Sequence, residues 1–458
     1  MFRTRQVYRS HHFIREIERL RENNVNRELI KKNRNAKILI ILHLFYPKSW
    51  KEIKEYISNI SEYDYDLIIT TTEGMIPNSI IEEILDFKQD TRIINCENRG
   101  FDLRPFLLAL RDLNLDDYDI VIKLQSKSTK RAWIYIYDQL FMRRDWFLDL
   151  FEGVLSAKVI HKNIDMLLND DTVGLVAAKN LIVNDPLHKV KMIQKIGKEK
   201  KLPVNDNYKF IAGTCFAIKA QCLKNIQDYL WTDEDFDPVP NSRGMSFAHF
   251  FERYICAQVE SVWHKKMVGT NVRKIRHAIL RIPGKILYKF SSYRLLSENI
   301  DFDPEYFYWQ LDNKLITYKF EEVPFKKIMY SDHGIRIPFT ENAPYKYLKG
   351  DVEEYKKYCE YHKNNGLPMM SIDRFEKLRE SIRKNGYDER HIIILNDRNE
   401  LMDGQHRACC LCEQLGEDAS IRVLKIHFIG IKEDLKRILP LSVQEKILAL
   451  KNNLGHRK

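Results

Sequence analysis

Residues 95–106 read NCENRGFDLRPF, and the fold of the first half of the chain is organised around them. They follow the short apolar segment 91–95 and open a segment with helical spacing, so they are expected to form a strand-to-helix turn. Gly100 supplies flexibility, while Arg99 and the backbone amides at the helix start can hold an anion. Asp102 falls in the first helical turn, where a carboxylate serves either as a cap or as a catalytic group. This stretch alone leaves both roles open.

Strands alternate with helical patterns on both sides of this turn. Residues 37–45 (KILIILHLF) form a near-continuous apolar run, which is typical of a buried parallel strand. The alternation predicts an α/β fold with a parallel sheet and right-handed crossovers. Ligands bind beyond the carboxyl ends of such strands. The other expected strands are 66–71, 91–95 and 119–124, and the side chains expected at one crevice are His43, Thr70–Thr72, Asn98–Asp102 and Lys123–Lys127.

Composition bounds the class of protein. A chain of 458 residues with 44% hydrophobic residues is globular and long enough for two or three domains. The net charge of +11 indicates an anionic partner, which could be nucleic acid, a membrane surface or a phosphate-bearing substrate. Eight cysteines without metal-ligand spacing fit a reducing compartment. The longest apolar run is too short to span a bilayer, so a cytoplasmic protein is expected, with any membrane contact peripheral.

Five regions are expected along the chain. Residues 273–296 interleave basic and apolar residues around Pro283-Gly284, which indicates either a surface helix pair at a domain boundary or an interfacial membrane segment. The same alternatives apply to the C-terminal tail. The regions are a leading helix (1–35), an α/β domain (36–270), a basic and aromatic linker (271–324), a smaller α+β domain (325–430) and a basic C-terminal helix (431–458).

Within the α/β domain, 134–169 is expected to be a long helical stretch and 210–218 (FIAGTCFAI) a strand. The Gly213-Thr214 step in this strand indicates a close backbone approach, either to a sugar or to a neighbouring helix.

Four motifs together resemble a known family. ENRGFDLRPFL (97–107), YDIVIKLQSKS (118–128), FIAGTCFAI (210–218) and FAHFFERY (247–254) occur in the order and spacing of the rhamnan synthesis protein F family of bacterial glycosyltransferases. The resemblance covers about residues 36–265. It implies a GT-A-like fold and a nucleotide-diphosphate-sugar donor that carries rhamnose or a related sugar. It also implies a lipid-linked or polysaccharide acceptor in the synthesis of a surface polysaccharide such as an O-antigen.

One stretch departs from this family. Just before FAHFFERY the family tends to carry an acidic Asp-Gly-Thr-like segment, whereas residues 243–246 read Arg-Gly-Met-Ser here. The donor sugar therefore stays open.

The strand end at 123–127 bears on the cofactor. Many GT-A enzymes place a metal-binding Asp-X-Asp there, but this chain reads KLQSK. Lysines can neutralise a departing diphosphate directly, so the predicted transfer is metal-independent and requires no cofactor. The alternative is that Lys123 and Lys127 are ordinary surface lysines. The residues predicted to bind the donor diphosphate and substrate are His43, Asn98, Arg99, Gly100, Lys123, Lys127, Gly213 and Thr214.

Inverting glycosyl transfer also needs a base for the acceptor hydroxyl. His249 and Glu252 lie three residues apart on one expected helix, so both side chains can point the same way. Glu252 is the first candidate for the base and Asp102 the second. The alternatives are an ion pair of Glu252 with Arg253 or Lys265, and core packing of His249.

A second constellation lies at Asp403-Gly404-Gln405-His406-Arg407, between a short strand and a helix that Gly416 is expected to cap. Its backbone amides and Arg407 suit a phosphate, and Asp403 is a candidate magnesium ligand. Residues 325–428 resemble the ParB/sulfiredoxin-like fold, which implies binding of ATP or CTP with magnesium. Gln405 replaces the catalytic cysteine of sulfiredoxin. The remaining roles are a nucleotide-dependent phosphotransferase acting on the glycan or its precursor, and a docking module.

The leading hypothesis is therefore a glycosyltransferase on the inner face of the bacterial inner membrane. Nucleic-acid binding ranks last, because the basic residues are scattered along the chain without stacking aromatics at regular spacing. About 30 residues follow the last expected strand, too few for the helix-turn-helix domain of a chromosome-partitioning ParB.

Overall fold

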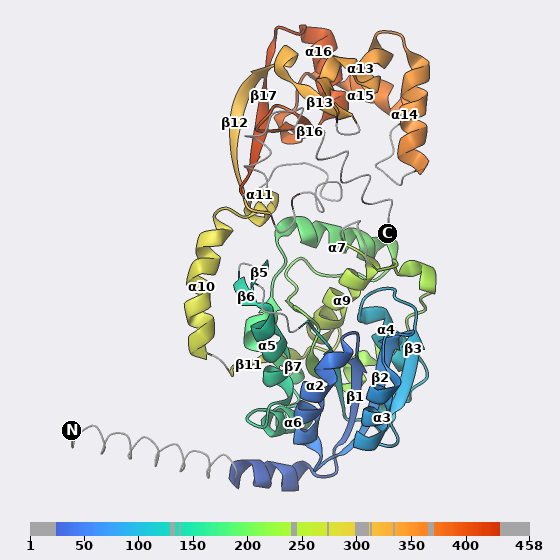
Figure 1. Ribbon diagram of the computed structural model, residues 1–458, viewed down its shortest axis with the longest axis vertical. Coiled ribbons are helices and arrows are strands. Elements are labelled where there is room, and N and C mark those ends of the chain that lie inside the picture. The colour runs from blue at the N-terminus through green and yellow to red at the C-terminus, as the bar shows by residue number, and fades with distance from the viewer. Residues whose placement is uncertain are drawn as a thin grey trace, which may run out of the picture. The chain divides into compact units, whose positions relative to one another are not determined.

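The computed structural model describes residues 24–128, 133–136, 139–239, 245–272, 274–297, 311, 314–332, 335–364 and 371–430. The chain divides into two compact units, residues 1–285 and 286–458, which Figure 1 shows by colour along the chain. Residues 24–33 are helical. The rest of the expected leading helix and the expected helix 431–458 lie outside the described residues.

A seven-stranded sheet with the order β11-β7-β10-β4-β1-β2-β3 forms the centre of the first unit (Figure 1). Neighbours from β4 to β3 run parallel, while β10 runs antiparallel to β4 and β7. The predicted α/β class is confirmed as a mixed, largely parallel sheet. Its strands are β1 (Lys37–His43), β2 (Asp64–Thr72), β3 (Arg92–Cys96), β4 (Ile120–Gln125), β7 (Val173–Ala178), β10 (Phe216–Lys219) and β11 (Lys266–Thr270).

The order of these strands defines where a ligand site belongs. From β1 the chain proceeds outward to β2 and β3, and then returns to β4 on the other side of β1. Such a reversal is a topological switch point, and ligands bind at the carboxyl ends of the strands that flank it. His43, the last residue of β1, is in register with Gln125, the last residue of β4. The predicted crevice residues therefore lie together at the carboxyl end of the parallel strands.

Two groups of helices pack on this sheet. One contains α4 (Leu103–Arg111), which packs on β1 and β2 and contacts α9 (Phe247–Ser261). The other contains α2 (Trp50–Ile57), α5 (Arg143–Leu155) and α6 (Ile160–Asn169). Apolar strands covered by helices explain why every residue of β4 is buried. Further helices are α3 (Asn78–Phe87), α7 (Leu187–Glu199) and α8 (Lys224–Gln227).

Two segments differ from the sequence prediction. The expected helical stretch 134–169 begins instead as a hairpin of β5 (Trp133–Ile136) and β6 (Gln139–Met142), because aromatic and β-branched residues favour strands. The expected strand 210–218 is divided into β9 (Phe210–Ile211), which pairs with β8 (Ile182–Val183), and β10. Gly213 (φ +86°) and Thr214 (φ +49°) separate the two, because left-handed residues cannot continue a strand.

The second unit contains a four-stranded sheet with the order β12-β17-β15-β16 and a separate hairpin, β13–β14. Gly416 ends α16 as predicted, with φ +89° and its N–H donating to Cys412. β12 was not predicted, since only Ile316 and Val323 of its nine residues are buried and its segment was expected to be a linker. The elements are β12 (Ile316–Pro324), β13 (Met329–Asp332), β14 (Ile335–Pro338), α13 (Ala343–Leu348), α14 (Val352–Asn364), α15 (Ile372–Asn385), β15 (Ile393–Asn396), β16 (Leu401–Asp403), α16 (Gln405–Leu415) and β17 (Ser420–Phe428).

Two helices, α10 (Lys274–Tyr288) and α11 (Ser292–Ser297), follow β11. Among the helices that the structure describes, none has the length and apolar character needed to cross a bilayer.

The turn between β3 and α4 is held under the loop 233–239. Gly100 has φ +61° and donates its N–H to the carbonyl of Asp237 at 3.0 Å, while Asn98 accepts from Val239 at 3.0 Å. A Cβ atom on Gly100 would lie 2.5 Å from Cδ1 of Phe236. The turn therefore requires glycine for its conformation and also for space.

We expect Gly100→Ala to lower the free energy of unfolding more than the control Gly74→Ala. Gly74 has a similar φ of +72°, but a Cβ atom added there would have no other atom within 4 Å. The control thus carries only the left-handed penalty, roughly 1–2 kcal/mol, whereas Gly100→Ala adds an overlap of roughly 1–3 kcal/mol. Urea unfolding measures both, and equal losses would show that the loop 233–239 yields without cost.

Candidate functional site

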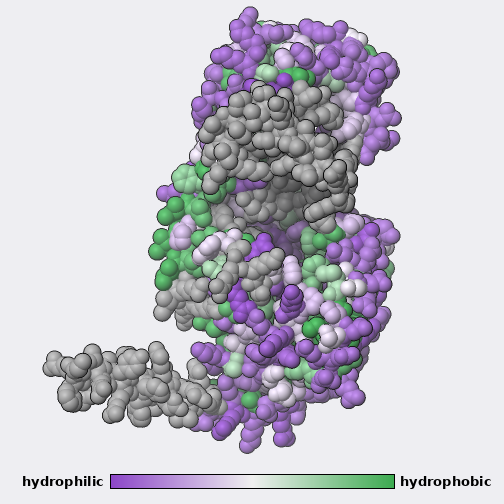
Figure 2. Space-filling model, viewed as in Figure 1, coloured by the Kyte–Doolittle hydropathy of each residue, from purple (hydrophilic) through white to green (hydrophobic). Residues whose placement is uncertain are grey.

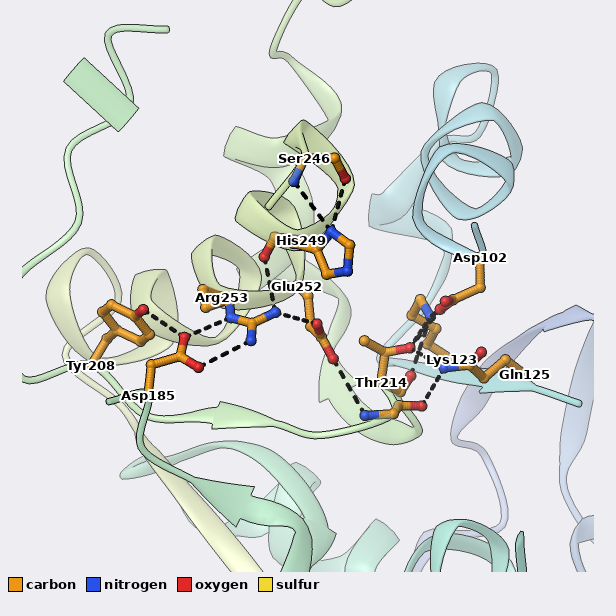
Figure 3. Close-up of polar contacts among 11 residues, drawn as sticks. Asp102, Lys123, Gln125, Asp185, Tyr208, Thr214, Ser246, His249, Glu252 and Arg253 are labelled. Atoms are coloured by element: carbon orange, nitrogen blue, oxygen red, sulfur yellow. Dashed lines mark hydrogen bonds and ion pairs between the residues drawn. The ribbon is translucent and has the colours of Figure 1, made fainter. Parts of the chain in front are cut away.

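A buried ion pair lies at the centre of the candidate site (Figure 3). Lys123 on β4 pairs with Asp102, the residue before α4, and both side chains are buried. Lys123 also donates to the carbonyl of Thr214 at 3.2 Å and to its hydroxyl at 2.8 Å. These bonds use all three N–H groups of the ammonium. In this arrangement Lys123 has no donor left for a diphosphate.

Asp102 occupies the N-cap position of α4 without capping it. Its side chain makes no cap hydrogen bond and instead accepts from Lys123 and from the hydroxyl of Thr214. Burial raises the pKa of the carboxyl, but the charges of Lys123 and Lys127 and these hydrogen bonds outweigh burial and lower it to about 2. Asp102 is therefore an ionised and weakly basic partner of Lys123. Its role as a second-choice base stays a prediction.

The Gly213-Thr214 turn joins this ion pair to its surroundings. Gln125 at the end of β4 donates to the carbonyl of Gly213 and, at 2.8 Å, to the hydroxyl of Thr214. A positive φ is unusual for a β-branched residue, so Thr214 holds a strained conformation that these bonds stabilise. A Cβ atom on Gly213 would lie 2.8 Å from Leu150 on α5. The close approach predicted at Gly213 is therefore to a neighbouring helix.

Glu252 faces the same turn from α9. Its Oε1 accepts the N–H of Gly213 at 3.3 Å, and its other oxygen pairs with Arg253. Burial raises the pKa of Glu252 above its ordinary value, although Arg253 opposes this effect. The side chain keeps 13% of its surface exposed. Glu252 is thus a partly accessible carboxyl with a raised pKa, next to Asp102 with a lowered one.

Arg253 is positioned by residues that the sequence analysis did not single out. Its guanidinium forms a bidentate pair with Asp185, at 2.7 and 3.1 Å, and both side chains are almost completely buried. Tyr208 donates its hydroxyl to Asp185 at 2.7 Å. A buried arginine in the apolar helix α9 requires a buried acidic partner. The presence of Arg253 in this apolar segment was therefore the sequence feature that could have predicted such a partner. The expected pair of Glu252 with Arg253 is present, whereas Lys265 donates to the carbonyl of Asp171.

His249 caps its own helix. Ser246, at the N-cap of α9, donates its backbone N–H to Nδ1 of His249 at 3.2 Å, in a capping box. A nitrogen that accepts a hydrogen bond carries no proton, so the neutral ring has its hydrogen on Nε2. Burial and the charges of Arg253 and Lys189 lower the pKa of His249 to about 3. The half-buried ring also contacts Phe101, with centroids 5.2 Å apart.

His43 is buried at the end of β1, and its Nδ1 lies 3.1 Å from the hydroxyl of Thr70. Burial lowers its pKa to about 4, so the ring is neutral near pH 7. It can bind a ligand by a hydrogen bond but carries no charge for a diphosphate.

Arg99 holds the loop 233–239. It bonds Glu97 at 3.1 Å and the carbonyl of Phe236 at 2.6 Å. The neighbouring Arg104 pairs with Asp233 at 2.8 Å. Part of the predicted anion-binding charge is therefore used within the protein.

Of the three basic residues predicted to bind the diphosphate, Arg99, Lys123 and Lys127, Lys127 is the one that remains available among the described contacts. It is half-buried, and its ammonium lies 5.4 Å from the ring centroid of Trp146. Within the described residues it has no hydrogen bond or ion pair, in contrast to Lys123 and Arg99. A cation held over an aromatic ring keeps its N–H groups free for an incoming anion.

The described residues contain no group of three or more His, Cys, Asp or Glu side chains that could hold a metal ion. The predicted metal independence stays a proposal.

In the second unit, the predicted phosphate turn is mostly engaged internally. Gly404 adopts the left-handed conformation before α16, and Arg407 pairs with Asp403 at 2.9 Å. Gln405 accepts from Tyr358 at 3.2 Å. His406 contacts the hydroxyl of Tyr355 at 3.0 Å, and burial lowers its pKa to about 3. Binding of phosphate, ATP, CTP or magnesium at this turn stays a prediction.

Comparison with known proteins identifies the family of the first unit. The family of rhamnan synthesis protein F matches residues 11–263, which is more than half of the chain. The chain belongs to this family, as the motifs predicted. Membership assigns it to the synthesis of rhamnan-type polysaccharide.

The other comparisons add little. No curated protein matches the chain. A solved structure of a Pnob8-like ParB-N domain is 21% identical, with a TM-score of 0.16, and the match covers 26% of this chain and 34% of that one. At this TM-score the likeness supports no conclusion, so the ParB-like nature of the second unit stays a prediction.

We expect single variants of the buried pair to be costly and the double variant to be less so. Asp102→Asn leaves Lys123 buried without a counter-charge, which costs roughly 3–5 kcal/mol. Lys123→Met likewise leaves Asp102 buried without a counter-charge. The combined variant should lose clearly less than the sum of the two, as urea unfolding of all three would show. Additive losses would mean that the two side chains act independently.

The same pair should make stability depend on acid. The pKa of Asp102 is about 2 when folded against an ordinary value of 3.8, so the unfolded chain takes up this proton first as the pH falls. The stabilisation, roughly 2 kcal/mol, is complete above pH 4 and is lost as the pH approaches 2. Asp102→Asn should lack this component of the pH profile. An unchanged profile would contradict the lowered pKa.

Proposed function

We propose that the protein is a metal-independent glycosyltransferase that moves rhamnose or a related sugar from a nucleotide-diphosphate donor to a lipid-linked or polysaccharide acceptor. The proposal rests on membership in the family and on one observation above all. Two carboxyls beside the switch point of the sheet, the partly accessible Glu252 and the buried Asp102, have pKa values shifted in opposite directions, up for Glu252 and down for Asp102. Environments that separate two carboxyls in this way assign them different chemical roles.

Glu252 is the proposed general base. The acceptor oxygen attacks the anomeric carbon, the bond from that carbon to the donor diphosphate breaks, and the acceptor proton passes to Glu252. A raised pKa suits this role, because a base is most effective when its pKa approaches the working pH. Because Lys123 and Thr214 both bond Oδ2 of Asp102, we assign this carboxylate to holding the Thr214 turn and not to a covalent double displacement. The proposed transfer is therefore a single displacement.

The charge of the departing diphosphate falls to Lys127 in this proposal. Its ammonium is free of ion pairs within the described residues and lies near Asp102, whose pKa it helps to lower. Lys123 and Arg99 contribute indirectly, by fixing the Thr214 turn and the loop 233–239. Neutral His43 and His249 are suited to hydrogen-bond the sugar or the nucleotide. We place the reaction in a GT-A-type domain at the cytoplasmic face of the membrane.

Glu252→Gln should reduce kcat for sugar transfer by about 10²–10⁴-fold, because the amide cannot accept the acceptor proton. Glu260→Gln is the matched control, since Glu260 lies on the same helix and is exposed. Transfer from dTDP-rhamnose and other nucleotide sugars to a lipid-linked acceptor measures both. In the wild type kcat should fall as the pH drops through the raised pKa of Glu252. Full activity of Glu252→Gln would remove Glu252 as the base.

Lys127→Met should weaken both donor binding and turnover, whereas EDTA should leave the activity of the wild type unchanged. The loss follows from the uncompensated charge of the leaving diphosphate. Lys51→Met, at an exposed lysine of α2, is the control. Strict dependence on manganese would contradict the assignment of this charge to Lys127. So would a Lys127→Met variant whose donor binding and turnover equal those of the wild type.

A further inference from the structure

The helix α10 carries an apolar stripe that faces solvent. Ile279, Ile282 and Ile286 repeat at helical spacing on one side and are 62%, 64% and 56% exposed, and Phe290 just beyond the helix continues the line. Figure 2 shows hydrophobic residues gathered at the left edge of the view, where Figure 1 labels α10. The neighbouring side of the helix, with Leu280, Gly284 and Leu287, is half-buried or buried. The stripe is therefore not the face that packs.

Positive charge borders the stripe. Arg281 and Lys285 lie one turn apart beside the isoleucines, Lys289 follows, and all three are exposed. Among the described residues none of the three has a side-chain hydrogen bond or an ion pair. Residues 273–297 contain seven Lys or Arg and no Asp or Glu. A second copy of the chain would thus meet the same positive charge, which opposes pairing of two stripes.

We propose that α10 docks the protein on an anionic lipid surface. The isoleucine stripe enters the boundary between headgroups and acyl chains, and Arg281, Lys285 and Lys289 contact anionic headgroups beside it. Long basic side chains can extend to the headgroups while the neighbouring apolar residues insert. Each basic residue near such a surface should strengthen binding about fivefold at low ionic strength. This inference rests on α10 alone and does not depend on the proposed glycosyl transfer.

Flotation of the full-length protein with vesicles tests the proposal. The protein should bind vesicles that contain about one-third phosphatidylglycerol, bind pure phosphatidylcholine far more weakly, and dissociate from the anionic vesicles as salt is raised. Ile282→Gln combined with Ile286→Gln should reduce binding about tenfold or more. Arg281→Gln combined with Lys285→Gln should reduce it comparably and flatten the salt dependence.

Matched controls replace similar residues elsewhere. Leu85→Gln removes an exposed leucine from α3, and Lys51→Gln combined with Lys191→Gln removes two exposed lysines. Both should bind vesicles as the wild type does, and transfer to a soluble acceptor should be unchanged in the α10 variants. The proposal would be overturned if the α10 variants bound vesicles as the wild type does, or if the wild type bound neutral vesicles equally well. It would also be overturned if the wild type bound no vesicles and instead formed a solution dimer that the isoleucine variant dissociates.

Discussion

The buried pair of Lys123 and Asp102 is the constraint on which the site depends. A lysine on a fully buried strand needs a counter-charge, since an isolated charge in an apolar interior is very costly. The start of α4 delivers Asp102, and the turn after β9 delivers Thr214, which bonds both partners. Three segments far apart in the sequence are thereby fixed at the switch point of the sheet. The strained conformation of Thr214 is tolerated because these bonds determine it.

The backbone of the Gly213-Thr214 turn connects this pair to Glu252. The turn that Lys123 and Gln125 hold also presents the N–H of Gly213 to Glu252, while the Asp185–Arg253 pair holds the other carboxylate oxygen. Glu252 is thus oriented from two sides (Figure 3), and its side chain keeps a small exposed surface. In the proposed reaction, the pair of Asp102 and Lys123 supplies structural charge, and Glu252 and Lys127 carry the chemistry.

The sequence predicted what local patterns encode. Apolar runs located β1, β2, β3 and β4, the alternation with helices indicated the sheet, and four motifs identified the family. It could not predict which charges neutralise one another, because Asp102, Lys123 and Thr214 meet only through the tertiary fold. The same is true of Asp185 and Arg253, which are 68 residues apart. Gly213-Thr214 was noted as a feature within a strand, but its left-handed φ values, which end the strand, follow from contacts with α5 and β4.

The central claim is that the site holds Asp102 as a fixed anion and Glu252 as a base. Carbon-13 NMR titration of the side-chain carboxyls, with Glu252→Gln and Asp102→Asn used for assignment, tests it most directly. The account predicts a pKa above the ordinary glutamate value for Glu252 and a pKa of about 2 for Asp102. An ordinary or lowered pKa for Glu252 together with a raised one for Asp102 would contradict it.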